Sequence, residues 1–123
     1  MTIQECYQQL GGDYAAVKSR LSSDSLIKRF ITKFLDDSSY SALCGAMQKG
    51  PGEEAFRAAH TLKGVCANLG LDQLEASASK LTELLRPAGS DIPEEAGVLM
   101  DEVKRNYEIT VGAIQAYLES PAE

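Results

Sequence analysis

The stretch that decides the fold of this chain is FRAAHTLKGVCANLG, residues 56–70. At about 100° per residue, a set of apolar side chains that includes Leu62, Val65 and Leu69 falls on one face of a helix. His60, the only histidine in the sequence, falls on the opposite face. The stretch therefore predicts a helix that packs by one side and presents an imidazole to solvent from the other. The predicted core face consists of Ala55, Ala58, Leu62, Val65, Cys66 and Leu69.

Sequence signals mark both ends of this helix. Pro51 suits a first turn, because its missing N–H would have no partner there in any case. Glu53 and Glu54 follow closely, and negative charge is favourable at the N-terminal end of the helix dipole. Gly70 comes directly after Leu69 and is predicted to end the helix in the left-handed conformation.

Helical periodicity fills the rest of the chain, and glycine and proline separate the segments. A single helix is favoured over residues 24–49, because no glycine or proline interrupts the polar join Asp37-Ser38-Ser39-Tyr40. Upstream we expect two short helices between Thr2 and Leu21, split by Gly11-Gly12, and then Ser22-Ser23 as capping candidates for the long helix. Downstream we expect Lys49-Gly50 to close that helix, Asp72 to cap a helix that ends at Arg86 and Pro87-Ala88-Gly89, and a last helix from near Pro93.

Four long amphipathic helices joined by short connections can bury their apolar stripes only against each other. The predicted fold class is therefore all-α, an antiparallel up-down-up-down four-helix bundle with short N-terminal helices. A length of 123 residues is enough for one domain with a buried core. We expect a single domain over residues 1–123, with the short helices in 1–21 and the bundle in 24–119.

The composition and net charge of the sequence argue against several classes of function. The net charge of −6 at pH 7 argues against a nucleic-acid binder, which would present a basic face, and against docking on anionic lipid. No apolar run approaches the roughly 18 residues that span a bilayer, and the first residues lack the pattern of a secretory signal. Cys6, Cys44 and Cys66 are far apart in the sequence, which is typical of reduced thiols in a cytoplasmic protein. One histidine cannot complete a typical zinc set, so we expect no metal and no cofactor.

The neighbours of His60 favour phosphoryl chemistry. Lys63, three residues on, can reach a phosphate on the ring and screen its charge of about −2. Gly64, four residues on, leaves no side chain above the ring, so that a partner can approach closely. Because glycine inside a helix costs about 1 kcal/mol relative to alanine, we expect a functional reason for Gly64. Ala67 is small and adds little bulk to the helix surface on the next turn.

Three residues are predicted to take part in partner docking: Ala67, and Phe56 and Arg57 about one turn before His60. Phe56 is a large apolar side chain on an otherwise polar face, which suits contact with a partner. A second interpretation makes Phe56 a rim residue under the N-terminal helices. Arg57 flanks His60 on its other side. Arg86 is interpreted as a favourable charge at the C-terminus of the next helix, with electrostatic help at the site as the alternative.

The next helix is predicted to supply further residues around the ring. With the turn centred near Gly70-Leu71, antiparallel pairing places residues level when their numbers sum to about 142. His60 then faces Thr82, and Lys63 faces Ser79. A hydrogen bond with Thr82 would fix the ring tautomer and leave the other nitrogen as the nucleophile. The small side chain of Ser79 keeps the approach open.

The segment HTLKG, residues 60–64, followed by five residues and then Gly70, resembles the H-x-[LI]-K-G-x5-G signature of histidine-containing phosphotransfer (HPt) domains. LGGD at residues 10–13 and the segment 30–37 resemble the usual lead-in of these domains, so that the resemblance covers most of residues 10–118. It implies that His60 accepts a phosphoryl group from a receiver-domain aspartate and passes it to another receiver. Thr82 departs from the pattern, because relatives often carry a longer glutamine or glutamate near that position.

The resemblance also implies the partners. These are response-regulator receiver domains and a hybrid sensor histidine kinase, with Mg²⁺ on the receiver and not on this chain. The chain would be a phosphocarrier and not an enzyme, because it has no glycine-rich nucleotide loop. Neither nucleic acid nor a membrane is expected as a partner.

Other interpretations stay open. The residues FRAAH, 56–60, also resemble the phosphoacceptor module of chemotaxis-type histidine kinases, although the early Gly-Gly-Asp lead-in and the short C-terminus favour a free-standing or excised HPt domain. A structural or adaptor bundle without phosphotransfer is the alternative from a different class. A di-metal or haem bundle is disfavoured, because Arg57 rules out a Glu-x-x-His pair and no C-x-x-C-H occurs.

Overall fold

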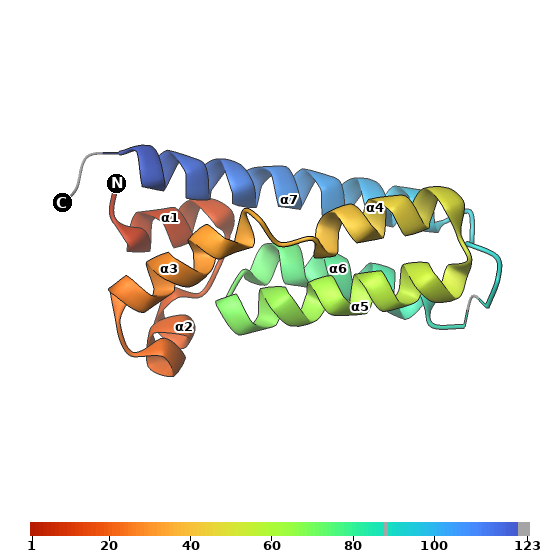
Figure 1. The fold of residues 1–123 in the computed structure, drawn as a ribbon, viewed down its shortest axis with the longest axis horizontal. Coiled ribbons are helices and arrows are strands. Elements are labelled where there is room, and N and C mark those ends of the chain that lie inside the picture. The colour runs from red at the N-terminus through yellow and green to blue at the C-terminus, as the bar shows by residue number, and fades with distance from the viewer. Residues whose placement is uncertain (88, 121–123) are drawn as a thin grey trace.

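The described part of the chain, residues 1–87 and 89–120 of a computed structural model, is helical and contains no strand. The predicted all-α fold class is therefore confirmed. The helices, drawn in Figure 1, are α1 (Ile3–Leu10), α2 (Tyr14–Leu21), α3 (Asp24–Phe34), α4 (Ser39–Lys49), α5 (Gly52–Leu69), α6 (Asp72–Leu85) and α7 (Ala96–Glu119). None of them is long and apolar enough to cross a membrane.

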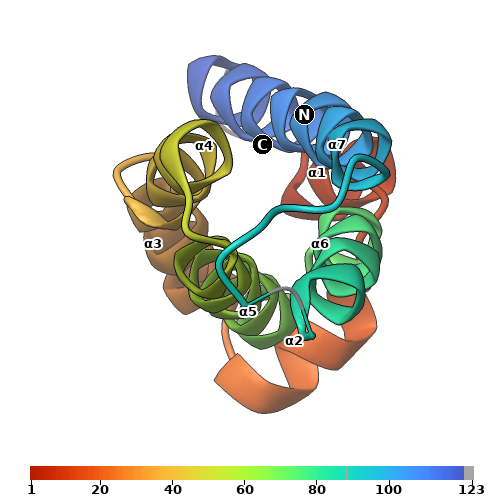
Figure 2. The same cartoon turned by 90° about the vertical axis from the view of Figure 1, so that its right-hand side faces the viewer.

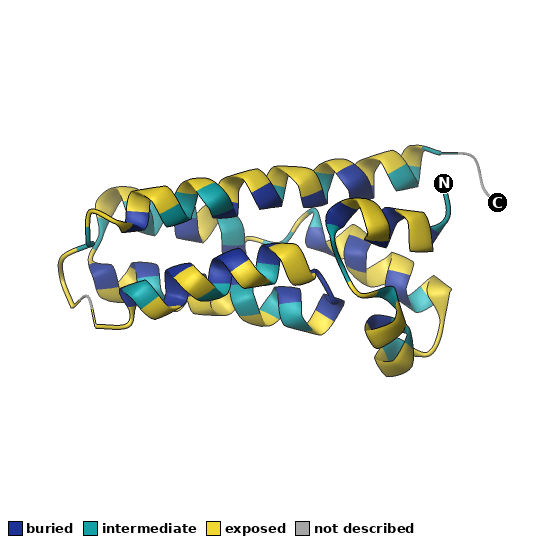
Figure 3. Ribbon diagram, turned by 180° about the vertical axis from the view of Figure 1, so that it is seen from behind, coloured by how far each residue is buried: buried dark blue, intermediate teal, exposed yellow. Residues whose placement is uncertain are grey.

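The longer helices surround one apolar core. Figure 2 shows α4, α5, α6 and α7 arranged around a common axis. α5 packs against α4 and α6, and α7 packs against α6 and α1. Figure 3 shows the buried positions as bands along the helices, and the fully buried side chains of this core include Leu43, Leu62, Leu74, Leu81 and Ile114. Burial of each such side chain contributes about 1.5–3 kcal/mol.

The single helix expected over residues 24–49 is wrong, because α3 and α4 are separated at residues 35–38. The N–H groups of Asp36 and Asp37 donate to carbonyls three residues back, which is tighter than the α-helical pattern. The Asp37 carboxylate then accepts from the backbone N–H of Ser39 at 2.8 Å and from the Ser39 hydroxyl. Aspartate side chains compete in this way for backbone groups, so the polar join ends α3 without glycine or proline.

Helices α1 and α2 lie at the end of the molecule where α5 turns into α6 (Figure 1). Gly11-Gly12 separates them as predicted. The Tyr7 hydroxyl donates to the Leu69 carbonyl at 2.7 Å, and the Asp13 N–H donates to the Gly70 carbonyl at 3.0 Å. A Cβ on Gly12 would lie 2.4 Å from the Gly70 carbonyl oxygen, so only glycine allows this close approach. The N-terminal helices thus hold the turn at the end of α5.

Several predicted helix ends are confirmed. Ser23 caps α3 by accepting from the Leu26 N–H at 3.1 Å. Gly70 follows α5 in the left-handed conformation, with φ of 67°. α7 begins at Ala96, shortly after Pro93. Of the segment predicted to close α6, Ala88 lies outside the described residues.

The predicted capping role of Asp72 is wrong. The N-cap of α6 is Leu71, which makes no side-chain cap bond, and Asp72 is the first residue of the helix. The N–H of Gln73 instead donates to the Gly11 carbonyl at 3.1 Å. A backbone carbonyl of the N-terminal segment therefore satisfies a helix-start N–H that a capping side chain would otherwise satisfy.

Candidate functional site

His60 lies midway along α5, and its side chain is exposed. The prediction that the ring faces solvent is confirmed. α5 has Glu53 and Glu54 in its first turn, and the N-terminal helices bind the carbonyls of Leu69 and Gly70 at its last turn. The imidazole is therefore presented from a helix that is held by packing and by hydrogen bonds, and not from a loop.

The buried stripe of α5 is rotated towards α6 relative to the prediction. Ala55, Leu62, Cys66 and Leu69 are buried as expected, but Ala58 and Val65 are only half-buried, and Gly52 and Ala59 are buried as well. The cause is that α5 makes its most extensive contact with α6. Consequently Phe56, Lys63 and Ala67, all predicted to lie on the solvent face, are half-buried.

Gly64 lies one turn after His60 and is exposed. Apart from the nearby backbone of its own helix, no atom of the described residues lies within 4 Å of a Cβ built at this position. Close helix packing therefore does not explain the glycine. Because glycine here costs about 1 kcal/mol, the open surface favours a role in access to the ring.

An aromatic side chain and a cationic side chain flank His60 on the side of α6. The ring centroids of Phe56 and His60 are 6.0 Å apart. The guanidinium carbon of Arg86 lies 5.0 Å from the Phe56 centroid, within the range of a cation–π contact. This contact fits the predicted antiparallel register of α5 and α6. Phe56 is thus covered from α6, and its partial burial does not come from the N-terminal helices.

Arg86 borders the site and is more than a helix-end charge. It lines one shallow surface hollow together with Phe56, Arg57, His60 and Thr61. Glu83 orients its guanidinium, with Oε2 accepting from Nη2 at 2.7 Å and Oε1 accepting from Nε at 3.3 Å. Periodicity places Arg86 level with Phe56, but it does not show which way a long exposed side chain turns.

Glu83 is an acidic group at this site and is not among the residues predicted from the sequence. Hydrogen bonding to Arg86 lowers the pKa of Glu83, and the charges of Lys63 and His60 lower it further. Its carboxylate therefore interacts with the groups on α5 that were predicted to handle a phosphoryl group. The signal in the sequence is position alone, because Glu83 directly follows Thr82, which the register places opposite His60.

Thr82 and Ser79 both lie on α6. Thr82 is 0% exposed, and its hydroxyl donates to the Ala78 carbonyl at 2.7 Å. Because the hydroxyl proton is used in this bond, a hydrogen bond between Thr82 and His60 would need an imidazole N–H as the donor and the hydroxyl oxygen as the acceptor. Ser79 is half-buried. The hydrogen bond between Thr82 and His60, and the contribution of Lys63, stay predictions.

Arg57 and Ala67, both predicted to contact a partner, also interact within the protein. Arg57 is exposed and forms ion pairs with Glu54 and, at 4.0 Å, with Glu53. The carbonyl of Ala67 accepts from Nη2 of Arg20 at 2.9 Å. Neither contact covers His60, and the docking role of both residues stays a prediction.

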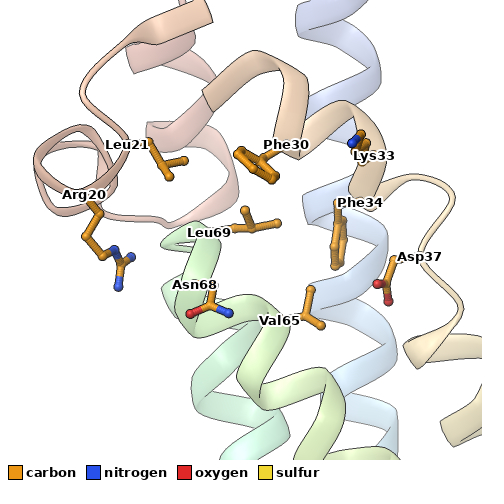
Figure 4. Close-up of a pocket in the computed structure, with 9 residues that line it drawn as sticks. All are labelled: Arg20, Leu21, Phe30, Lys33, Phe34, Asp37, Val65, Asn68 and Leu69. Carbon is orange, nitrogen blue, oxygen red and sulfur yellow. The ribbon is translucent and has the colours of Figure 1, made fainter. Parts of the chain in front are cut away.

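A second hollow lies beside the C-terminal half of α5, and Figure 4 shows the side chains around it. This cavity has a volume of about 420 Å³. Its apolar lining comes from Leu21, Phe30, Phe34, Val65 and Leu69, and its polar lining comes from Arg20, Lys33, Asp37 and Asn68. Phe30 is 37% exposed, and the Lys33 ammonium lies 6.0 Å from its ring centroid.

The cysteines are free in the structure. Cys66 lies in the core as predicted, and burial raises the pKa of its thiol to about 12. Burial likewise raises the pKa of the Cys6 thiol to about 11. Both thiols are neutral near pH 7, and a neutral thiol is a poor nucleophile. Within residues 1–87 and 89–120, no group of three or more His, Cys, Asp or Glu residues could hold a metal ion.

Fold and site together define an all-helical module built around one surface histidine. The family model of the Hpt domain matches residues 29–118 of the sequence, and the chain belongs to this family. Hpt domains are phosphocarrier modules that act in histidine phosphotransfer in phosphorelay signalling. Comparison with curated proteins and with solved structures gave no match.

Proposed function

We propose that His60 is the phosphoacceptor of this Hpt domain and that the chain carries phosphoryl groups between receiver domains. The observation that carries the proposal is an exposed imidazole in the middle of α5, with open surface at Gly64 on the following turn. Lys63 and Arg86 add positive charge on the side of α6. A buried ring or a bulky neighbour at position 64 would have removed the support for this function.

The transfer needs position and charge more than it needs acid–base groups. A ring nitrogen that carries no proton attacks phosphorus with its lone pair, and an N–P bond forms. The P–O bond to the aspartate of the receiver breaks, and its electron pair returns to the carboxylate. Lys63 and Arg86 then face a phosphoryl group with a charge of about −2, to which charge-assisted hydrogen bonds are strong. The reverse steps deliver the group to a second receiver.

The receiver is proposed to dock along the exposed side of α5. His60, Gly64 and Asn68 are all exposed, and positions four residues apart share one helix face. The row they form spans roughly 12 Å at 1.5 Å per residue. Asn68 lines the cavity of Figure 4, so the row leads from the imidazole to the exposed ring of Phe30. Phe56, Arg57 and Ala67 border the same surface.

The partners and setting follow from this role. We propose response-regulator receivers and a hybrid sensor histidine kinase as partners, with Mg²⁺ bound by the receiver, and the cytoplasm as the location. The chain itself is proposed to have no enzymatic activity. We also assign α4 to α7 as an antiparallel up-down-up-down bundle within one domain over residues 1–123. This is supported by the packing of α4 on α5, α5 on α6 and α6 on α7.

The direct test is phosphorylation of the native chain and of His60→Gln. Incubation with a phosphorylated receiver from the same genome should place an acid-labile label on the native chain and none on the variant. The variant should keep its helical circular dichroism and its unfolding midpoint, because the side chain is exposed. Acid-labile label that persists in His60→Gln would place the acceptor elsewhere.

The docking surface is tested with a matched pair of substitutions. Phe30→Asp should reduce the rate of transfer from a receiver several-fold, because it puts a charge into an apolar contact. Ile109→Asp is the control, since Ile109 is similarly exposed at 39% but lies on α7. Phosphorylation by phosphoramidate, which needs no docking surface, should be the same in both variants. Equal transfer rates in the two variants would exclude Phe30 from the interface.

Two alternatives are separated by the same measurements. A chemotaxis-type phosphoacceptor module would take its phosphate from an ATP-bound kinase domain, so purified kinase domains with ATP should label it faster than receivers do. An adaptor bundle would acquire no label from either donor. The open surface at Gly64 favours the phosphocarrier over the adaptor, because a purely structural helix gains about 1 kcal/mol from alanine at that position.

A further inference from the structure

The charges around His60 are not all positive, and the acidic group among them has a defined position. Glu83 holds the Arg86 guanidinium through two hydrogen bonds, of 2.7 and 3.3 Å. Arg86 in turn lies over the Phe56 ring, whose centroid is 6.0 Å from that of His60. These contacts form a chain from Glu83 on α6 to the imidazole on α5. Both Glu83 and Arg86 are exposed, so either side chain can change partner without disturbing the core.

Phosphorylation of His60 would alter this arrangement in two ways. The phosphoryl group adds a charge of about −2 to a histidine whose charge already acts on the Glu83 carboxylate, and like charges repel. Its oxygens also offer Arg86 a better acceptor than a carboxylate, because a guanidinium binds phosphate with paired hydrogen bonds. Lys63, whose charge also acts on Glu83, is drawn to the same phosphate.

We infer that Glu83 is a positioning residue that sets how firmly this domain keeps its phosphoryl group. In the unphosphorylated chain it holds Arg86 beside His60. In the phosphorylated chain Glu83 competes with the phosphoryl group for Arg86, and its negative charge repels the phosphoryl group. The effect favours onward transfer over storage. This inference rests on the proposed function, because it concerns the phosphorylated state of His60.

The expected effect of Glu83 on the lifetime of phosphohistidine is modest. The interaction of an exposed carboxylate with a dianion is screened by water and salt, so we expect a change of about 2- to 5-fold in the lifetime of phosphohistidine. The direction is the informative part. Glu83→Gln removes the charge, frees Arg86 for the phosphate, and should lengthen the lifetime. Glu83→Asp keeps the charge and should stay closer to the native value.

The experiment uses the full chain, phosphorylated with phosphoramidate and freed of donor, with no receiver present. The first-order loss of phosphohistidine is followed by ³¹P NMR at pH 7.5, at low and at high salt. In this loss water attacks phosphorus, the N–P bond breaks, and the ring nitrogen recovers a proton. Glu108→Gln is the matched control, because it makes the same charge change at an exposed position on α7.

Several outcomes decide between the possibilities. A lifetime 2- to 5-fold longer in Glu83→Gln than in Glu108→Gln, with a difference that shrinks at high salt, supports the inference. In an Arg86→Gln background the effect of Glu83→Gln should be smaller, because the competition for the guanidinium is gone. Equal or shorter lifetimes in Glu83→Gln overturn the inference and leave the proposed function standing. Absence of label on His60 in the native chain overturns both.

Discussion

Replacement of Gly64 should separate stability from phosphotransfer, because the two depend on the position in opposite ways. A Cβ at this position meets open space, and the residue lies inside a helix of 18 residues. Alanine is favoured over glycine there by about 1 kcal/mol, so Gly64→Ala should stabilise the fold. With an unfolding entropy of about 2.1 cal/mol/K per residue, this corresponds to a rise in Tm of about 4 °C.

Transfer should change in the other direction. A methyl group at position 64 brings bulk to the surface where a receiver must approach, and a glutamine brings more. We expect transfer from a phosphorylated receiver to slow in Gly64→Ala and to fall to background in Gly64→Gln. Labelling by phosphoramidate should change little in either variant, because a small donor reaches the ring without docking.

Gly112 provides the matched control. It lies inside α7, it is exposed, and a Cβ there also meets nothing within 4 Å among the described residues. Gly112→Ala should therefore raise Tm by a similar amount and leave transfer unchanged. Thermal unfolding and receiver-transfer rates measured on the same preparations test both parts. Loss of stability in Gly64→Ala, or full transfer activity in Gly64→Gln, would refute the reasoning.

Three further predictions concern the charge, the core and the thiol. Lys63→Ala should slow transfer by about tenfold without abolishing it, the loss expected for one charge-assisted contact, and an effect no larger than that of Lys104→Ala on α7 would remove the role assigned to Lys63. Leu62→Ala should destabilise the fold by about 2–5 kcal/mol in urea unfolding, because Leu62 is fully buried; a smaller loss would mean that the core closes over the gap. The pKa of Cys66 is raised to about 12 in the folded state from an ordinary value of 9.0, so its contribution to stability is complete below pH 9 and declines as the pH rises towards 12. The stability difference between the native chain and Cys66→Ala should therefore shrink above pH 9, and a constant difference would contradict this assignment.

The sequence was sufficient to predict α5 and its exposed histidine. Apolar periodicity and the left-handed Gly70 are local signals, and the structure agrees with both. The break between α3 and α4 is missed because it depends on one carboxylate, that of Asp37, bonding to the backbone of Ser39. Such a bond competes with helix formation without leaving a glycine or proline in the sequence.

The remaining differences come from tertiary contacts. Asp72 has the residue type of a cap, but the Gly11 carbonyl already occupies the Gln73 N–H. This pairing joins segments about 60 residues apart, and no local pattern reveals it. The positions of Arg86 and Glu83 beside the imidazole depend on the rotamers of long exposed side chains, which helix periodicity does not determine.

The hydrogen bonds from the first helices to the α5–α6 turn bear on where this domain can be cut. The matched family region starts at residue 29, whereas Tyr7, Asp13 and Gly11 lie before it and bond to that turn. A fragment trimmed to the family boundary would expose the apolar side of α7 that α1 covers. It would also remove the hydrogen bonds that the N-terminal segment makes with the turn between α5 and α6. We therefore expect the smallest autonomous unit for biochemical work to be larger than the region that defines the family.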